Sequence, residues 1–199
     1  FDVPAARSHH AEVYINGEYM GLYLNVEQID DEFVQRRFTY NAGNIYKCYW
    51  GANLADAGQV YNNEIFELET NKEINDRSKL QNMVNVLNNT PSSSFIPEIE
   101  KVFDVDRYLR YLAVEALVGH WDGYSYNQNN FYLYENDSTG LIEFIAYDLD
   151  NTFGIAWIER DWGTRDVLDW VIHGNENPRP LSNKILAQKT YYERYRRYL

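Results

Sequence analysis

Residues 121–134 read WDGYSYNQNNFYLY, and residues 145–154 read IAYDLDNTFG. Each stretch joins strongly β-prone apolar residues to acids or side-chain amides. A turn around Gly140 separates the two apolar runs, so the sequence predicts two antiparallel strands with polar residues at their ends. Polar residues held at the end of a rigid sheet are common carriers of chemistry. One acid, a pair of amides and two further acids therefore form a candidate site for a metal ion and phosphates.

The order of these polar residues matches the order of the catalytic parts in protein kinases. In kinases one Asp receives the proton of the attacking hydroxyl, while an Asn and a later Asp hold Mg²⁺. Asp122 stands in the first position here and Asp148 in the last. Because Asp-Gly is a common turn pair, Asp122 could instead bond its own backbone in a turn. Acids that converge on one cleft repel each other without a cation or donor, which favours the site.

Two asparagines compete for the metal position between these acids. Kinase-like spacing from Asp122 indicates Asn127, whereas Asn130 directly precedes a strand. We favour Asn130, because a residue at the start of a strand has a fixed direction and Asn127 lies in a loop that tolerates insertion. Asp148 and Asp150 are two residues apart, so on a strand both would face the same side and suit Mg²⁺. The alternative for Asp150 is a helix cap or turn.

Three blocks of the sequence resemble one known family. Residues 130–134 (NFYLY), the Gly140 turn and residues 148–154 (DLDNTFG) resemble the core signature of the CotH family. This family is named for the spore coat protein H and is regarded as a group of atypical, secreted-type protein kinases. Two further blocks are similar to family segments: residues 13–30 (VYINGEYMGLYLNVEQID) and residues 43–47 (GNIYK). The blocks appear in one order and span nearly the whole chain.

The resemblance implies ATP-dependent and Mg²⁺-dependent phosphorylation of a Ser, Thr or Tyr hydroxyl on a protein substrate. It also implies an extracytoplasmic location or one at a cell or spore surface. Family members generally carry more strands upstream, so we expect strands that precede Phe1. The chain has neither G-x-G-x-x-G nor a Walker A motif, so a loop that covers the phosphates must be atypical or lie upstream.

Two early residues are candidates for a kinase-like ion pair. Lys47 is the expected phosphate contact, and Glu27 could hold it in place as the Lys-Glu pair of kinases does. The alternative for Lys47 is a solvated surface lysine. Tyr147 is the expected neighbour of the adenine ring. Asp122 is the expected base or hydroxyl-orienting group. The expected metal ligands are Asn130 and Asp148, with Asp150 as a supporting ligand.

Composition limits the classes that fit. A chain of 199 residues, 45% hydrophobic, suits one globular domain over 1–199. No apolar run is long enough to span a bilayer. The net charge of −12 argues against a nucleic-acid-binding protein but not against ATP, whose charge Mg²⁺ can meet locally. Cys48 is the single cysteine, which excludes an intrachain disulfide, and with His9 and His10 it lacks any zinc spacing.

Periodicity and turn residues predict an α+β fold, an antiparallel sheet with packed helices and a distantly kinase-like layout. Asn16-Gly17 is a strong hairpin signal. The helix after Asp104 or Asp106 is apolar on most faces and is expected to be central. The expected strands are 12–16, 19–26, 45–50, 64–69 and the two site strands, and the expected helices are 30–37, 75–87, 104–118, 165–173 and 182–198, with a linker at 92–97.

Two other classes of function remain open. A binding or structural module of a coat or surface would explain the 18 Tyr and the absence of a glycine loop. A metal-dependent hydrolase would also use acids with an Asn.

Overall fold

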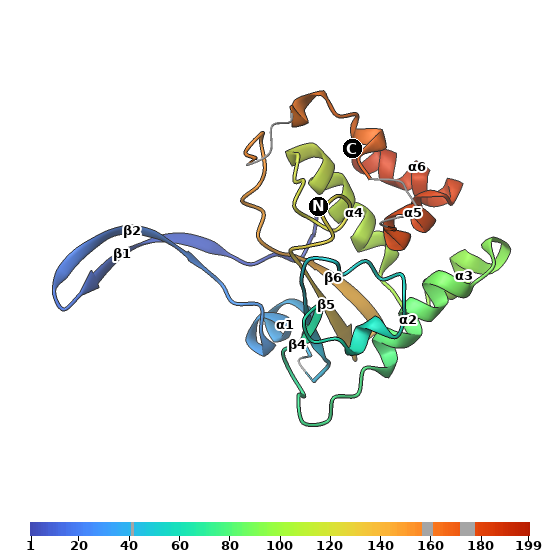
Figure 1. The fold of residues 1–199 in the computed structure, drawn as a ribbon, viewed down its shortest axis with the longest axis horizontal. Coiled ribbons are helices and arrows are strands. Elements are labelled where there is room, and N and C mark those ends of the chain that lie inside the picture. The colour runs from blue at the N-terminus through green and yellow to red at the C-terminus, as the bar shows by residue number, and fades with distance from the viewer. Residues whose placement is uncertain (41, 157–160, 172–177) are drawn as a thin grey trace.

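The computed structural model describes residues 1–40, 42–156, 161–171 and 178–199. Its centre is an antiparallel sheet of four strands in the order β4-β3-β5-β6 (Figure 1). The strands are β3 (Ile45–Cys48), β4 (Phe66–Leu68), β5 (Phe131–Asn136) and β6 (Leu141–Ala146). The mixed helix and antiparallel sheet confirms the predicted α+β class, and the two site strands pair as a hairpin as predicted.

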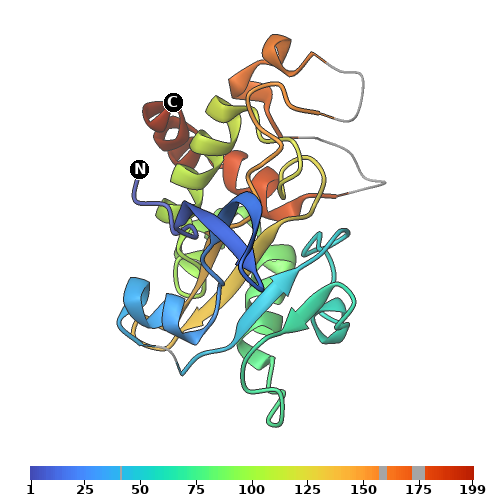
Figure 2. The same cartoon turned by 90° about the vertical axis from the view of Figure 1, so that its left-hand side faces the viewer.

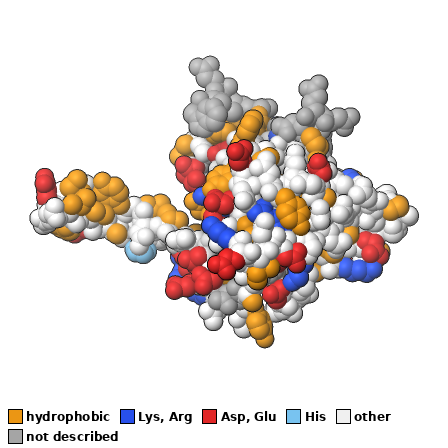
Figure 3. Space-filling model, turned by 60° about the horizontal axis from the view of Figure 1, so that its bottom comes forward, with side chains coloured by type: hydrophobic (Ala, Val, Ile, Leu, Met, Phe, Trp, Pro, Cys, Tyr) orange, Lys and Arg blue, Asp and Glu red, His pale blue; other side chains and the backbone are white. Residues whose placement is uncertain are grey.

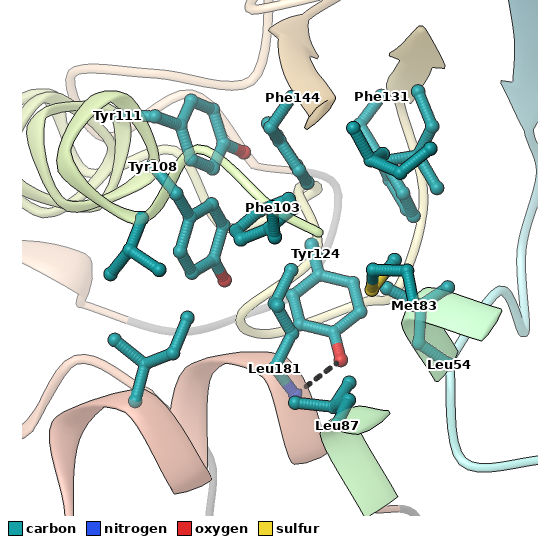
Figure 4. Close-up of a cluster of buried hydrophobic side chains, with 14 of the residues drawn as sticks. Leu54, Met83, Leu87, Phe103, Tyr108, Tyr111, Tyr124, Phe131, Phe144 and Leu181 are labelled. Atoms are coloured by element: carbon teal, nitrogen blue, oxygen red, sulfur yellow. Dashed lines mark hydrogen bonds between the residues drawn. The ribbon is translucent and has the colours of Figure 1, made fainter. Parts of the chain in front are cut away.

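Both faces of this sheet are covered, because β5 is apolar on both sides and all of its residues are buried. One face packs against α2 (Ser78–Asn89) and α4 (Val105–Val118). Figure 4 shows Phe131 and Phe144 from this face among side chains of both helices. On the other face, Tyr132 and Tyr134 pack with α1 (Asp31–Phe38).

Capping residues fix where the helices begin. Asp30 accepts a hydrogen bond from the backbone N–H of Phe33 at 3.1 Å and starts α1. Asp104 does the same for Arg107 at 3.0 Å, so α4 begins where one of the two expected caps stands. The helix ends at Gly119, whose φ of 68° suits a residue without a side chain. The fully buried face of α4 makes it the central helix, and its end leads directly to Asp122.

The remaining helices are α3 (Phe95–Ile99), α5 (Pro180–Leu186) and α6 (Lys189–Tyr198). The single helix predicted for 182–198 is therefore two helices. The linker predicted at 92–97 is wrong, because residues 92–94 form a 3₁₀ turn and residues 95–97 are the first part of α3. The helix predicted for 165–173 is wrong in its described part: residues 167–169 form a short 3₁₀ turn that Asp166 caps. Its last two residues lie outside the described ranges. Asp161 and Asp166 bond nearby backbone N–H groups in turns, which competes with a regular helix.

The predicted Asn16-Gly17 hairpin is confirmed, but it does not join the central sheet. Strands β1 (Ser8–Ile15) and β2 (Glu18–Val26) form a separate arm that projects from the rest of the chain (Figure 1) and points towards the viewer in Figure 2. Asn16 and Gly17 both have positive φ, as a tight hairpin turn with the favoured twist requires. Figure 3 shows apolar side chains along this arm; the exposed large ones are Tyr14, Ile15, Tyr19, Met20, Leu22, Tyr23, Leu24 and Val26.

Within the described ranges, no helix combines the length and the apolar character needed to cross a membrane.

Candidate active site

Asp122 is the point at which the candidate side chains converge. Its Oδ1 accepts a hydrogen bond from the Asn127 side-chain amide at 2.5 Å, and its Oδ2 accepts one from the Asn130 amide at 2.9 Å. The Asn151 amide reaches the same Oδ2 at 3.4 Å. Both asparagines that competed for the metal position therefore orient Asp122. Because three donors surround it and the residue is buried, the Asp122 carboxylate is fixed in direction.

Left-handed backbone occurs at both strand ends of the site. Asn130 precedes β5 with a φ of 54°, and Asp148 follows β6 with a φ of 51°. Asn and Asp adopt this conformation more readily than other residues with a side chain, so it suits both positions. Since Phe131 pairs with Ala146, the two residues stand at the same end of the hairpin. A shared metal ion between Asn130 and Asp148 stays a prediction.

The prediction that Asp148 and Asp150 lie on one strand is wrong. The strand β6 ends at Ala146, so Asp148 and Asp150 do not alternate along a strand as predicted. Asp150 lies in a turn, where it accepts a hydrogen bond from the Asn151 amide at 3.0 Å. Both acids nevertheless line one cavity of about 390 Å³. Its other walls are Ala5, Ala6, Ser8, Leu24, Val26, Ala146, Tyr147 and Leu149, which brings the base of the arm to the site.

Electrostatics couple the three acids. Partial burial is the main cause that raises the pKa of Asp148 above its ordinary value of 3.8, and the charges of Asp150 and Asp122 add to it. The Lys47 ammonium acts in the opposite direction. The cluster therefore carries negative charge that a divalent cation would stabilise.

Lys47 lies on the sheet face that carries Tyr132, its partner in β5. Its Nζ is 5.0 Å from the centre of the Tyr49 ring and 5.5 Å from that of Tyr147. Partial burial favours a lower pKa, but the Tyr49 and Tyr147 hydroxyls and the Glu69 carboxylate outweigh it and raise the pKa of Lys47. The lysine is therefore a charged group between two aromatic rings, which favours a fixed position over a freely solvated side chain.

The predicted Lys47–Glu27 ion pair is wrong. The Glu27 carboxylate instead binds Arg36 at 2.5 Å and Arg7 at 3.0 Å. Slight burial opposes the effect, but the hydrogen bonds from Arg7 and Arg36 lower the pKa of Glu27 to about 2. The reason is the topology of the chain. Glu27 lies between the separate arm and α1, whereas Lys47 belongs to the central sheet, so the two side chains do not meet.

A magnesium ion would need donors beyond the carboxylates. Across the described part of the chain, no three His, Cys, Asp or Glu side chains form a group able to hold a metal. Asp148 and Asp150, which line one cavity, give a partial set of oxygen donors. This is the pattern of Mg²⁺ sites in which nucleotide phosphates and water supply the remaining ligands, so the residues present fit such an ion.

Sequence order alone did not single out three residues of the site, which are His120, Asn151 and Glu115. His120 and Asn127 complete an H-x-D-x-x-x-x-N pattern around Asp122, the spacing of the kinase catalytic loop, so the signal was present. Burial lowers the pKa of His120, although the Asn151 backbone and the charges of Asp122 and Asp150 oppose it. Asn151 directly follows the paired acids. Glu115 is the third, and its signal was a carboxylate among the apolar residues in the second half of the most apolar helix.

Comparisons with known proteins agree with the earlier resemblance. The family described as CotH kinase protein matches residues 1–199. The inner spore coat protein H of Bacillus subtilis (strain 168) is 30% identical over 200 residues, which cover 97% of this chain and 52% of that protein. The invasin CotH3 of Rhizopus delemar is 32% identical over 121 residues, which cover 59% of this chain and 18% of that protein. The chain thus spans about half the length of the Bacillus relative and less of the fungal one. It belongs to the CotH family.

Proposed function

We propose that this domain transfers the γ-phosphoryl group of ATP to a hydroxyl group of a protein substrate. The observation that carries the proposal is the orientation of the Asp122 carboxylate. It accepts hydrogen bonds from the side-chain amides of Asn127 and Asn130 and lies near the acids that follow β6. In phosphoryl transfer, positioning and electrostatic stabilisation dominate catalysis. Asp122 would align the acceptor hydroxyl and receive its proton.

The other residues would bind the nucleotide. Mg²⁺, when bound, neutralises charge on the transferring phosphoryl group. Asp148, supported by Asp150 and an asparagine oxygen, would hold the ion at the cavity next to Tyr147. Lys47 would contact a phosphate, and the Tyr147 ring would stack near the adenine. No glutamate of the described residues pairs with Lys47, so its two tyrosine neighbours would take over the orienting role of the kinase glutamate.

A direct assay tests this proposal. The chain is incubated with labelled ATP and Mg²⁺, alone for autophosphorylation and with peptides that offer Ser, Thr or Tyr. Incorporated label that disappears with EDTA supports a protein kinase. Release of inorganic phosphate without protein labelling would favour the hydrolase, and neither product would favour a binding module.

Replacing Lys47 with methionine is expected to weaken Mg²⁺-ATP binding by about tenfold, because a charge-assisted contact to phosphate is lost while the apolar stem stays. Calorimetric titration measures the change. Lys101→Met is the matched control, since Lys101 is exposed and pairs with Glu98 at the end of α3. Equal affinities for the two variants would remove Lys47 from the nucleotide site.

A non-catalytic binding module is the second candidate, and the exposed apolar arm favours it. Contiguous apolar surface often marks an interaction site. The relatives carry the descriptions spore coat protein and invasin, so by analogy we place this domain in a coat or at a surface. The two functions are compatible, because the cavity at Asp148 involves only Ser8, Leu24 and Val26 of the arm.

A further inference from the structure

The Glu115 carboxylate on α4 is completely buried, although it belongs to no part of the proposed chemistry. One of its oxygens accepts a hydrogen bond from the Tyr111 hydroxyl at 3.0 Å, and the other accepts one from the Ser125 hydroxyl at 2.5 Å. The Ser125 backbone also hydrogen-bonds it. Ser125 lies between Asp122 and Asn127 in the sequence. The Glu115 carboxylate is therefore hydrogen-bonded to the loop that carries the site.

Gly123 shows how closely the loop approaches this carboxylate. A Cβ atom added at Gly123 would lie 2.2 Å from Glu115 Oε1, 2.7 Å from the Tyr111 hydroxyl and 2.9 Å from the His120 ring. The residue directly after Asp122 must therefore be glycine for its backbone to rest on Glu115. The backbone N–H of His120 donates to the Glu115 carbonyl oxygen at 2.9 Å. The residue before Trp121-Asp122 is therefore bonded to the Glu115 backbone, and the residue after them lies against the Glu115 side chain.

The start of α5 holds the loop from the other side. The backbone N–H of Leu181 donates to the Tyr124 hydroxyl at 3.1 Å, the bond drawn in Figure 4. The Gln128 amide donates to the Pro178 carbonyl oxygen at 2.6 Å. Ser182 lies 3.5 Å from the Ser125 hydroxyl and bonds the Tyr108 hydroxyl at 2.7 Å. A continuous polar network therefore joins α4, the Asp122 loop and α5.

Burying the Glu115 carboxylate costs more desolvation free energy than burying a neutral residue that could bond the same two hydroxyl groups. Burial raises the pKa of Glu115 from 4.5 to about 7, although the bonds from Ser125 and Tyr111 oppose this. An apolar residue would suit the interior of α4 better, because a buried acid costs desolvation free energy. A carboxylate differs from an apolar residue, and from an amide, in accepting hydrogen bonds through both oxygens. This capacity matches the two hydroxyl donors, each of which bonds a different oxygen of Glu115.

From these contacts we propose that Glu115 is the positioning residue of the Asp122 loop, holding Gly123 and Ser125 so that Asp122 stays directed at the acceptor hydroxyl. The catalytic part of this inference rests on the proposed phosphotransfer, whereas the ordering of the loop does not. Glutamine is a poor replacement, because it has one acceptor oxygen where the carboxylate has two, so one of the two hydroxyl groups would have to turn its O–H away and accept from the NH₂ group.

Hydrogen exchange tests the ordering of the loop without any assay of activity. In Glu115→Gln, backbone amides of residues 120–128 are expected to exchange at least about tenfold faster, while those of α2 and β3 change by less than about twofold. Glu135→Gln is the matched control, because Glu135 is also buried and accepts a 2.6 Å bond from a tyrosine hydroxyl, that of Tyr46. Ser125→Ala removes the hydroxyl contact alone and decides the question if Glu115→Gln does not fold.

Kinetics test the link to Asp122. In Glu115→Gln, kcat is expected to fall about tenfold with Mg²⁺-ATP affinity within about twofold of the wild type. Adding Asp122→Asn to Glu115→Gln should lower kcat no further than Asp122→Asn alone, because Glu115 acts only through Asp122. Additive losses, or unchanged exchange at 120–128, would overturn the inference. A wild type without phosphotransfer would contradict the proposed function, and the exchange data would still decide the role of Glu115.

Discussion

Replacing Asp122 with asparagine is expected to lower phosphotransfer by about 10²–10⁴-fold, while Mg²⁺-ATP affinity and the fold stay nearly unchanged. A carboxylate that aligns the acceptor acts in the transition state, so its loss appears in turnover rather than in nucleotide binding. The new NH₂ group would also face the amide of Asn127 or Asn130, both of which now donate to Asp122. Rate and nucleotide affinity are measured on the same preparations.

Asp137→Asn is the control for this prediction. Asp137 is a surface acid that pairs with Lys79 at the opposite end of the β5–β6 hairpin, so its loss should leave turnover within about twofold. If Asp122→Asn keeps the turnover of the wild type, the proposed mechanism is wrong, and the binding module or the hydrolase becomes the better account.

Replacing Gly43 with alanine is expected to destabilise the fold by about 3 kcal/mol or more. A Cβ atom at this position would lie 1.7 Å from the carbonyl oxygen of Glu135, which is backbone of β5 and cannot rotate away. The Glu135 N–H bonds the Asn44 carbonyl oxygen at 2.9 Å, so the strands would have to separate where they join. This contact explains why the GNIYK block begins with glycine.

Chemical denaturation measures the free energy of unfolding of Gly43→Ala, and Gly58→Ala is the control. Gly58 has a φ of −71°, which any residue adopts, and its nearest neighbour is the flexible Asp56 side chain at 3.3 Å. The control should stay within about 0.5 kcal/mol of the wild type. An equally small effect at Gly43 would show that Gly43 and the Glu135 carbonyl oxygen are not in close contact.

Local patterns were sufficient to predict the parts of the fold that local chemistry determines. The Asn16-Gly17 turn needs positive φ at two positions, and Asp104 caps α4 with its own side chain. The strands β5 and β6 follow from dense β-prone residues around one turn. The helix predicted for 165–173 failed because Asp166 offers the backbone a competing hydrogen bond that periodicity does not reveal.

The site was only partly predictable, because its contacts join distant segments. Sequence order indicated Asp122, Asn130 and Asp148, and the structure brings the first two into contact. The choice between Asn127 and Asn130 was less sharp than it seemed, because both donate to Asp122. The cations that face Glu27 depend on how the chain leads from the arm into α1, and the carboxylate that lies against Gly123 depends on how α4 packs. Glu115 stands out in the sequence as an acid on an apolar helix, but neither contact can be predicted from local sequence.

Thermal unfolding with and without Mg²⁺ and ATP tests the central claim, that this site binds a metal–nucleotide complex. A ligand at 100 times its Kd stabilises a native state by about 2.7 kcal/mol, which corresponds to a rise in Tm of about 5–10 °C for a domain of this size. We expect that rise for the wild type only with Mg²⁺ and ATP together, and a much smaller one for Asp148→Asn. An unchanged Tm at millimolar Mg²⁺-ATP, or an equal rise in Asp148→Asn, would contradict the claim.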